Sequence, residues 1–335
     1  MKSDNLFRML LALGLSAPWG FWCAPAAWAQ PKTGTPGAAA TPTPPSDPLQ
    51  DALKRLQSAE PAIRRQAADE LGRLRRREAA QPLIDALRDD NDFVRSTALA
   101  ALGLLREPKA LPKMIALLGD DASAQVRQQA AISLAFLGSP QSEDALMRAL
   151  KDEASGVRFA AARTLGALRS QKAVASLTAA LHDPDSNMRM TAAAALGQIG
   201  SAKSVAGLQE AFSDKDITVR REALKALSQA ADPSSRDTFK KALADEDAQI
   251  RLQAALALGR LGDFSGEPVA VALLHDPERA LRGQAASYLG LSGSKNKGLA
   301  ALVAADSAEK DAALKLILSN AAAQLKARLG AADAP

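Results

Sequence analysis

From residue 48 onward, short segments whose apolar residues lie three and four positions apart alternate with polar turns. In one stretch, residues 174–181 carry one apolar face, residues 182–187 are polar, and residues 188–199 carry a second apolar face that ends before Gly200. Apolar residues at this spacing lie on one side of an α-helix, and glycine is typical of the position after a helix. The pattern therefore predicts pairs of helices joined by short turns.

The helix pairs are copies of one sequence unit. Eight arginines follow one another at intervals of 31 residues, once 32, and each has an apolar residue before it, alanine three positions after it and leucine seven positions after it. Glycine follows that leucine in six copies, whereas Ala135 and Ser228 replace it in the other two. A helix pair with apolar surface on several sides cannot bury it alone, so we expect the copies to stack. The arginines are Arg64, Arg95, Arg127, Arg158, Arg189, Arg220, Arg251 and Arg282.

Stacking of these units predicts an all-α fold, an α-solenoid with a right-handed superhelix of eight repeats over residues 48–293. Aromatic residues make up only 4% of the chain, which also favours alanine-rich helices over a β-sandwich.

Both ends of the array differ from its middle. The repeating arginines, here called the arginine column, end where Ala313 stands in place of a ninth arginine, and residues 307–329 predict one longer helix. We assign residues 294–335 to C-terminal capping helices and interpret the longer helix as a degenerate ninth repeat that closes the array; a helix that docks on another chain is the alternative. Arginines cluster at residues 73–77 of the first repeat, as expected for the solvent-exposed face of a terminal repeat. A docking site for acidic polymer or lipid headgroups is the alternative.

An aspartate stands six positions before the arginine in every copy except the first, where Ser58 replaces it. Together with the other columns, this aspartate resembles the pattern of HEAT-like repeats, which occur in phycobilin lyases and many bacterial scaffold proteins. The resemblance implies a structural ladder in which aspartates and arginines join successive repeats, and a row that binds anions is the alternative. The ladder residues are Asp89, Arg95, Asp121, Arg127, Asp152, Arg158, Asp183, Arg189, Asp214, Arg220, Asp245, Arg251, Asp276 and Arg282.

Residues 1–29 predict a secretory signal peptide. Two basic residues precede the apolar stretch 9–15, and Ala27-Trp28-Ala29 matches the A-x-A pattern of a cleavage site. Residues 30–47, rich in Pro, Thr and Ala, predict an extended linker. We expect cleavage after Ala29 and export, to a periplasm; a retained membrane anchor is the alternative.

The composition leaves little material for catalysis. The 335 residues include one cysteine and two histidines, and the 42 basic residues exceed the 37 acidic ones only slightly. His182 and His275 lie three repeats apart, roughly 27 Å at about 9 Å per helix, which is too far to share a metal ion. No His-Glu pair occurs, although the HEAT-repeat deoxyhypusine hydroxylase, a relative of such repeats, uses these pairs at a di-iron site. We predict no metal, no cofactor, no nucleic-acid partner, no stable membrane insertion after signal cleavage and no enzymatic activity; an enzyme resembling phycobilin lyases or that hydroxylase is the alternative.

One face of the second helix is predicted to meet a partner. Positions two, five, six and nine after each arginine point away from the packed side, and the resemblance to HEAT-like repeats places them on the concave side. This face is largely uncharged in the middle repeats, and an exposed apolar stripe is typical of a contact site. We predict a non-catalytic scaffold that holds a protein or extended peptide there; a spacer without a ligand is the alternative. The predicted contact residues are Thr97, Leu104, Gln129, Ile132, Ser133, Phe136, Arg163, Thr164, Thr191 and Gln198.

Overall fold

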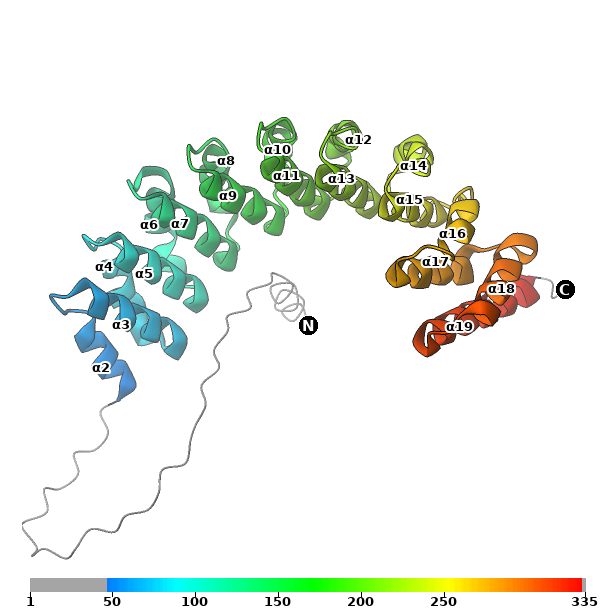
Figure 1. Ribbon diagram of the computed structural model, residues 1–335. Helices are drawn as coiled ribbons and strands as arrows, with labels where there is room; N and C mark the ends of the chain where they lie inside the picture. The colour runs from blue at the N-terminus through cyan, green and yellow to red at the C-terminus, as the bar shows by residue number, and fades with distance from the viewer. Residues whose placement is uncertain (1–46, 333–335) are drawn as a thin grey trace, which may run out of the picture. The chain divides into compact units, whose positions relative to one another are not determined.

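The computed structural model describes residues 47–332, which form pairs of helices joined by short turns (Figure 1). Within this range no β-strand occurs, and the all-α prediction is confirmed. The first helices of the pairs, here called outer helices, are α2 (Pro48–Arg55), α4 (Ala80–Ala86), α6 (Leu111–Asp120), α8 (Glu143–Ala149), α10 (Val174–Ala180), α12 (Val205–Ala211), α14 (Arg236–Ala242), α16 (Glu267–Leu273) and α18 (Ala300–Ala308). The second helices, here called inner helices, are α3 (Pro61–Leu74), α5 (Asp92–Leu105), α7 (Ala124–Leu137), α9 (Ser155–Ala167), α11 (Ser186–Ile199), α13 (Ile217–Ala230), α15 (Ala248–Arg260), α17 (Arg279–Ser292) and α19 (Ala312–Ala332).

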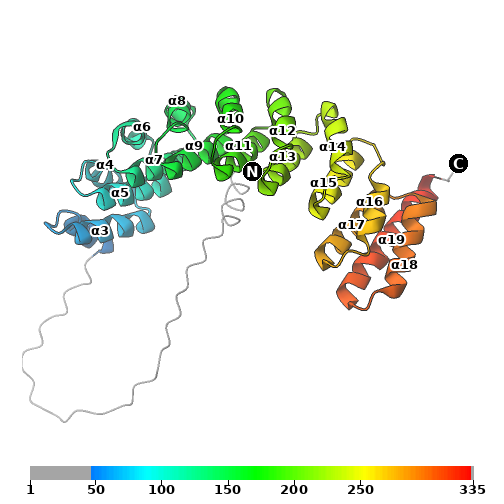
Figure 2. The same cartoon turned by 45° about the horizontal axis from the view of Figure 1, so that its top comes forward.

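The helix pairs follow one another as a two-layered, curved row. From α5 to α15 the inner helices lie side by side along the concave side, and the outer helices lie on the convex side (Figure 1). The same two layers are visible from a second direction in Figure 2. Single 3₁₀ turns lead into the outer helices α4 to α14, and a π-helical turn, Lys295–Leu299, leads into α18. The predicted α-solenoid is therefore the observed architecture.

The glycines that stand eight positions after the repeating arginines, here called the glycine column, set the close spacing of the inner helices. A Cβ atom placed on Gly72 would lie 2.8 Å from the Cβ of Ala101 in the next repeat, and one placed on Gly197 would lie 2.8 Å from the Cβ of Ala226. These distances are shorter than van der Waals contact, so a side chain at either glycine would force the helices apart. From the second repeat on, the residue six positions after the arginine is thus covered by the preceding repeat.

Buried apolar residues form two clusters that meet in α15. The first cluster extends from Leu49 to Leu258, and the second extends from Leu252 to Leu325. Because Leu252 and Leu258 both belong to α15, this helix packs with each cluster through a different part of its surface. The core is therefore divided at the seventh helix pair.

The long helix predicted over residues 307–329 is observed as α19, but it begins later, at Ala312, because residues 307–308 end α18. α18 ends at Ala308, the chain is extended at Glu309, and Asp311 begins the next helix by accepting hydrogen bonds from the backbone N–H groups of Ala313 and Leu314 at 3.0 and 2.9 Å. The N–H of Lys315 bonds to the carbonyl of Asp311, as each column arginine bonds four residues back. Lys315, two residues beyond Ala313, therefore occupies the arginine position in the ninth helix pair.

The last inner helix has a solvent-exposed outer face. The position four residues after the arginine is buried alanine or leucine in the first eight pairs, but it is exposed Ser319 in α19. The glycine column is replaced there by Ala323, which is exposed, as is Gln324 beside it. A tenth pair would contact these positions, and their exposure is expected of a terminal cap. No helix within residues 47–332 is long and apolar enough to cross a membrane. The predicted signal peptide (1–29) and residues 30–46 of the predicted linker lie outside the described residues.

Candidate partner-binding face

Four arginine–aspartate pairs between neighbouring repeats are bidentate ion pairs, three of them among the predicted ladder residues and one formed by Arg64. In each pair, the arginine Nε and Nη2 donate to the two carboxylate oxygens of an aspartate in the next turn. The Nε···Oδ2 and Nη2···Oδ1 distances are 2.6 and 2.7 Å for Arg64–Asp89, 2.8 and 2.9 Å for Arg95–Asp121, 2.8 and 2.9 Å for Arg127–Asp152, and 2.6 and 2.9 Å for Arg189–Asp214. Planar forks of this kind fix both the distance and the orientation of the two groups.

Each ladder arginine also binds the turn before its own helix. Arg95 Nη1 donates to the carbonyl oxygens of Asp89 and Asp90 at 2.9 and 3.2 Å, and the other seven column arginines repeat this contact. The aspartate in turn accepts a hydrogen bond from the N–H two residues later, for example from Ser123 to Asp121 at 2.8 Å. Each arginine–aspartate pair of the ladder is here called a rung. In a bidentate rung, one arginine therefore joins the turns of two repeats and keeps few donors for an external anion.

Electrostatics hold these aspartates in the charged form. The hydrogen bond from Arg127 lowers the pKa of Asp152, and the hydrogen bond from Arg189 lowers the pKa of Asp214. Burial opposes this shift at Asp121, but the hydrogen bonds from Arg95 and from the backbone of Ser123 outweigh it, and the pKa is again lowered.

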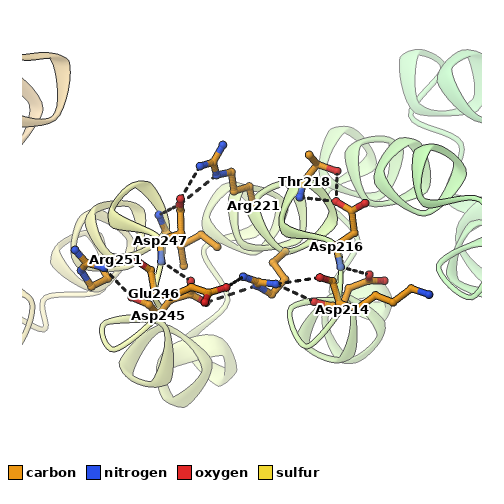
Figure 3. Close-up of polar contacts among 11 residues, drawn as sticks. Asp214, Asp216, Thr218, Arg221, Asp245, Glu246, Asp247 and Arg251 are labelled. Atoms are coloured by element: carbon orange, nitrogen blue, oxygen red, sulfur yellow. Dashed lines mark hydrogen bonds and ion pairs between the residues drawn. The ribbon is translucent and has the colours of Figure 1, made fainter. Parts of the chain in front are cut away.

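The ladder is irregular at its fourth pair and again in the C-terminal repeats. Arg158–Asp183 and Arg220–Asp245 are separated by 3.8 and 3.7 Å between Nε and Oδ2. Arg220 Nη2 donates instead to Glu246, at 2.9 Å (Figure 3). Within residues 47–332, no ion pair within 4.0 Å joins Arg251 to Asp276. An open hollow of about 460 Å³, lined in part by these two residues and by His275, lies at this position.

One further rung was missed by the sequence analysis. Arg282 Nε lies 3.4 Å from Glu309 Oε2, so a glutamate takes the aspartate position in front of the ninth inner helix. The spacing to Lys315 is two residues longer than the repeat predicts, and this shifted the expected column to Ala313. A search that allowed insertions and accepted Glu for Asp could have found the rung.

The predicted contact residues differ in accessibility. Leu104 and Ile132 expose 38% and 36% of their surface, and Arg163 is also exposed. Five others are half-buried: Thr97, Gln129, Phe136, Thr191 and Gln198. The hydroxyls of Thr97 and Thr191 donate to backbone carbonyls four residues earlier, at 2.8 and 2.7 Å. These eight residues lie at the concave positions of neighbouring inner helices.

Ser133 and Thr164 were predicted to contact a partner, and this is wrong because both are buried between inner helices. Ser133 lies against Gly103 of the preceding repeat, where an added Cβ would be 3.2 Å from the serine Cβ. Thr164 donates its hydroxyl hydrogen to the carbonyl of Ala131 at 2.9 Å. A helical wheel for one helix counts this sixth position as outward, but the neighbouring helix covers it.

The concave face changes character along the row. Around Leu104 and Ile132 it is apolar, whereas between α13 and α15 it contains a polar cleft of about 470 Å³. The cleft is lined mainly by charged and amide side chains, including Arg221, Glu222, Lys225, Gln229, Gln253 and Arg260. The sequence analysis did not predict this cleft, although these residues stand in or beside the concave columns.

The two histidines lie apart from this face, in the exposed turns after α10 and α16. In the described part of the chain, no group of three or more His, Cys, Asp and Glu side chains is arranged to hold a metal ion.

Comparison with known proteins identifies the repeat. The model of the family described as HEAT repeats matches residues 49–135, 114–186, 174–249 and 237–321. Phycocyanobilin lyase subunit alpha of Picosynechococcus sp. (strain ATCC 27264 / PCC 7002 / PR-6) is 35% identical over 81 residues, which are 24% of this chain and 30% of that relative. The chain therefore matches less than a third of that relative's length.

Solved structures resemble the array. YibA of E. coli has a TM-score of 0.58 and 21% identity, and the match covers 81% of this chain and 98% of YibA. The complex of CpcE and CpcF of phycocyanin lyase from Nostoc sp. PCC7120 has a TM-score of 0.43 and 26% identity, over 68% of this chain and 92% of the matched chain. The likeness to YibA concerns the fold alone. Since the family model matches overlapping segments from residue 49 to residue 321, the chain belongs to the HEAT-repeat proteins.

Proposed function

We propose that the array is a non-catalytic scaffold that binds a protein partner on the concave face of the inner helices α5 and α7. The observation that carries this proposal is the exposure of Leu104 on α5 and Ile132 on the adjacent α7. Half-buried Phe136 lies one helical turn beyond Ile132, and the exposed or half-buried side chains at Ala100 and Ala167 are small. Large apolar side chains beside small ones offer a surface that a partner side chain can cover.

Burial of these two side chains by a partner supplies part of the binding free energy. Complete burial of an exposed leucine or isoleucine contributes about 1.5–3 kcal/mol. Leu104 and Ile132 still expose somewhat more than a third of their surface, so a partner gains roughly two fifths of that energy from each. Their replacement by aspartate also buries a charge without a partner, which costs more than the apolar contact contributes.

The proposal places the partner outside the cytoplasm, on the strength of the signal peptide predicted over residues 1–29. Cleavage after Ala29 would release the array into a periplasm. Mass spectrometry of the mature N-terminus tests this part: a chain beginning at Gln30 supports it, and a chain retaining residues 1–29 contradicts it.

The binding proposal is tested with Leu104→Asp and Ile132→Asp, made together in the full chain. The control carries Ala116→Asp and Ala175→Asp, two exposed positions on outer helices of the same array. Both variants are crosslinked in envelope extract of the native host, and the crosslinked partners are measured by mass spectrometry. The amount of partner recovered should be at least tenfold lower with Leu104→Asp plus Ile132→Asp than with the control. Equal recovery from both, with equal melting temperatures, would contradict the proposal.

A second candidate is a bilin lyase activity, favoured by the 35% identity over 81 residues to a phycocyanobilin lyase subunit. The match is to a subunit and covers only 30% of it. The other enzyme considered, a di-iron hydroxylase, is disfavoured because the chain has no His-Glu pair. Phycocyanobilin added to the purified protein and apo-phycocyanin should give no covalent adduct above the uncatalysed control. An accelerated adduct, or iron bound stoichiometrically, would replace the scaffold proposal by an enzymatic one.

A further inference from the structure

The polar cleft between α13 and α15 is a second concave feature with its own chemistry. Its nine lining residues come from these two inner helices alone, and its volume is about 470 Å³. α13 and α15 contact each other over fewer residues than α11 and α13 do. Ser228 stands in the glycine column at this junction, so the closest approach seen at Gly197 is blocked by a side chain.

Two of the three cationic side chains in the cleft form ion pairs with carboxylates, and the third does not. Arg221 forms a bidentate pair with Asp247, at 3.1 and 2.5 Å (Figure 3), and Lys225 binds Glu222 at 3.0 Å. Arg260 donates only to the hydroxyl of Ser228, at 3.3 Å, and no carboxylate within residues 47–332 lies within 4.0 Å of it. Three cations against two acids leave one positive charge, on an exposed guanidinium with free donors.

The other lining groups suit a peptide backbone. Gln229, Gln249 and Gln253 each carry a donor and an acceptor on one side chain, and an extended peptide presents alternating N–H and C=O groups. Leu256 is the one large apolar residue among the lining residues. Glu222 beside the cations disfavours a phosphate backbone of regularly spaced charges, whereas a single carboxylate can meet Arg260.

We propose that this cleft binds an acidic residue, Asp or Glu, of an extended partner segment that also covers the apolar patch of α5 and α7. This inference rests on the proposed function and adds the chemistry of the partner. From α7 to α15, which carries Arg260, is four inner-helix steps, roughly 36 Å at about 9 Å per step. An extended chain spans this distance with about ten residues, so the partner carries its acidic residue about ten positions from its apolar residues.

The test is selection of random 16-residue peptides, displayed on phage, against the immobilised full chain. Selected peptides should be enriched in Asp or Glu about ten positions from apolar residues. Their Kd, measured by fluorescence anisotropy with synthetic copies, should rise at least tenfold with Lys225→Glu plus Arg260→Glu. A fresh selection on that variant should favour Lys or Arg. The matched control is Arg148→Glu plus Lys241→Glu, the same charge change at exposed positions on outer helices.

The outcomes separate the two proposals. Peptides that lose affinity with Leu104→Asp plus Ile132→Asp but not with Lys225→Glu plus Arg260→Glu overturn the cleft assignment and leave the scaffold proposal standing. Peptides insensitive to both pairs, or a selection that enriches none, overturn both. Circular dichroism of each variant identifies unfolding, and Arg260→Gln, which only removes the charge, should still weaken binding about fivefold or more.

Discussion

The junctions between α3 and α13 differ from the two junctions on either side of α15. In the first group, adjacent inner helices contact each other extensively, and four of the five arginine–aspartate pairs are bidentate. Beside α15 the contacts are sparser, Arg220–Asp245 is stretched to 3.7 Å, and Arg251 and Asp276 form no ion pair. The division of the core into two clusters falls at the same helix.

One substitution in the repeat accounts for the second loose junction. The position six residues after the arginine is small in the repeats from the second to the seventh, but it is Tyr288 in the eighth. Its ring lies against Gly259, where an added Cβ would be 3.0 Å from the tyrosine Cε2. A ring between two inner helices holds them farther apart than alanine does. The sparser contact between α15 and α17 therefore goes with a bulky residue between the two inner helices.

The largest expected effect is on the tight side of this comparison. Gly197→Leu should lower the free energy of unfolding by about 3 kcal/mol, because its Cβ would lie 2.8 Å from that of Ala226. Gly119→Ala is the control, since its Cβ meets nothing within 4 Å, and it should be neutral or slightly stabilising. Urea denaturation followed by circular dichroism measures both. Similar values for the two variants would show that the glycine column does not set the spacing.

A matched pair of rung variants gives the next largest effect. Asp214→Ala removes the bidentate partner of Arg189, while Asp276→Ala removes an aspartate without such a partner. Both aspartates accept an N–H two residues later at 2.8 Å, so that loss is common to the two. The first variant should be less stable than the second by about 2 kcal/mol, because it leaves a largely buried guanidinium unpaired. Equal losses would mean that the rung itself contributes nothing.

Acid should weaken the same rungs. The pKa values of the ladder residues Asp152 and Asp214 are lowered by their arginines. Outside the ladder, hydrogen bonds from Ser265 lower the pKa of Asp263 to about 2. A depressed folded-state pKa gives stability that is present above the unfolded value of about 3.9 and is lost as pH falls through the folded value. Stability should therefore hold from pH 7 to pH 5 and fall below about pH 4. Asp214→Asn should reduce the slope of that fall, and an unchanged slope would exclude this rung as its source.

The smallest effect concerns the hydroxyl of Tyr288. This group is buried, has no hydrogen-bond partner among the described residues, and burial raises the pKa of Tyr288 to about 12. Tyr288→Phe removes the unpaired polar atom and keeps the ring, so it should stabilise the protein by about 1 kcal/mol. Thermal unfolding of the two proteins measures this. A loss of stability would indicate that the hydroxyl has a partner in solution.

The repeat columns predicted most of what depends on local spacing. The arginines and aspartates stand in register, so the neighbours in the ladder could be named before the structure was known, including Arg189 and Asp214. Ser133 was misplaced because a wheel for one helix ignores the glycine of the preceding repeat. The rung from Arg282 to Glu309 was missed because two extra residues shift the register. The cleft beside Arg260 depends on how far apart two helices stand, which no single-helix pattern contains.

Hydrogen exchange of the full chain, with and without the tightest selected peptide, tests the scaffold proposal most directly. Amides of the inner helices α5, α7, α13 and α15 should exchange more slowly in the complex, and those of the outer helices α6, α8 and α12 should not change. Protection on the outer helices, or none anywhere in the array, would contradict recognition by the concave face.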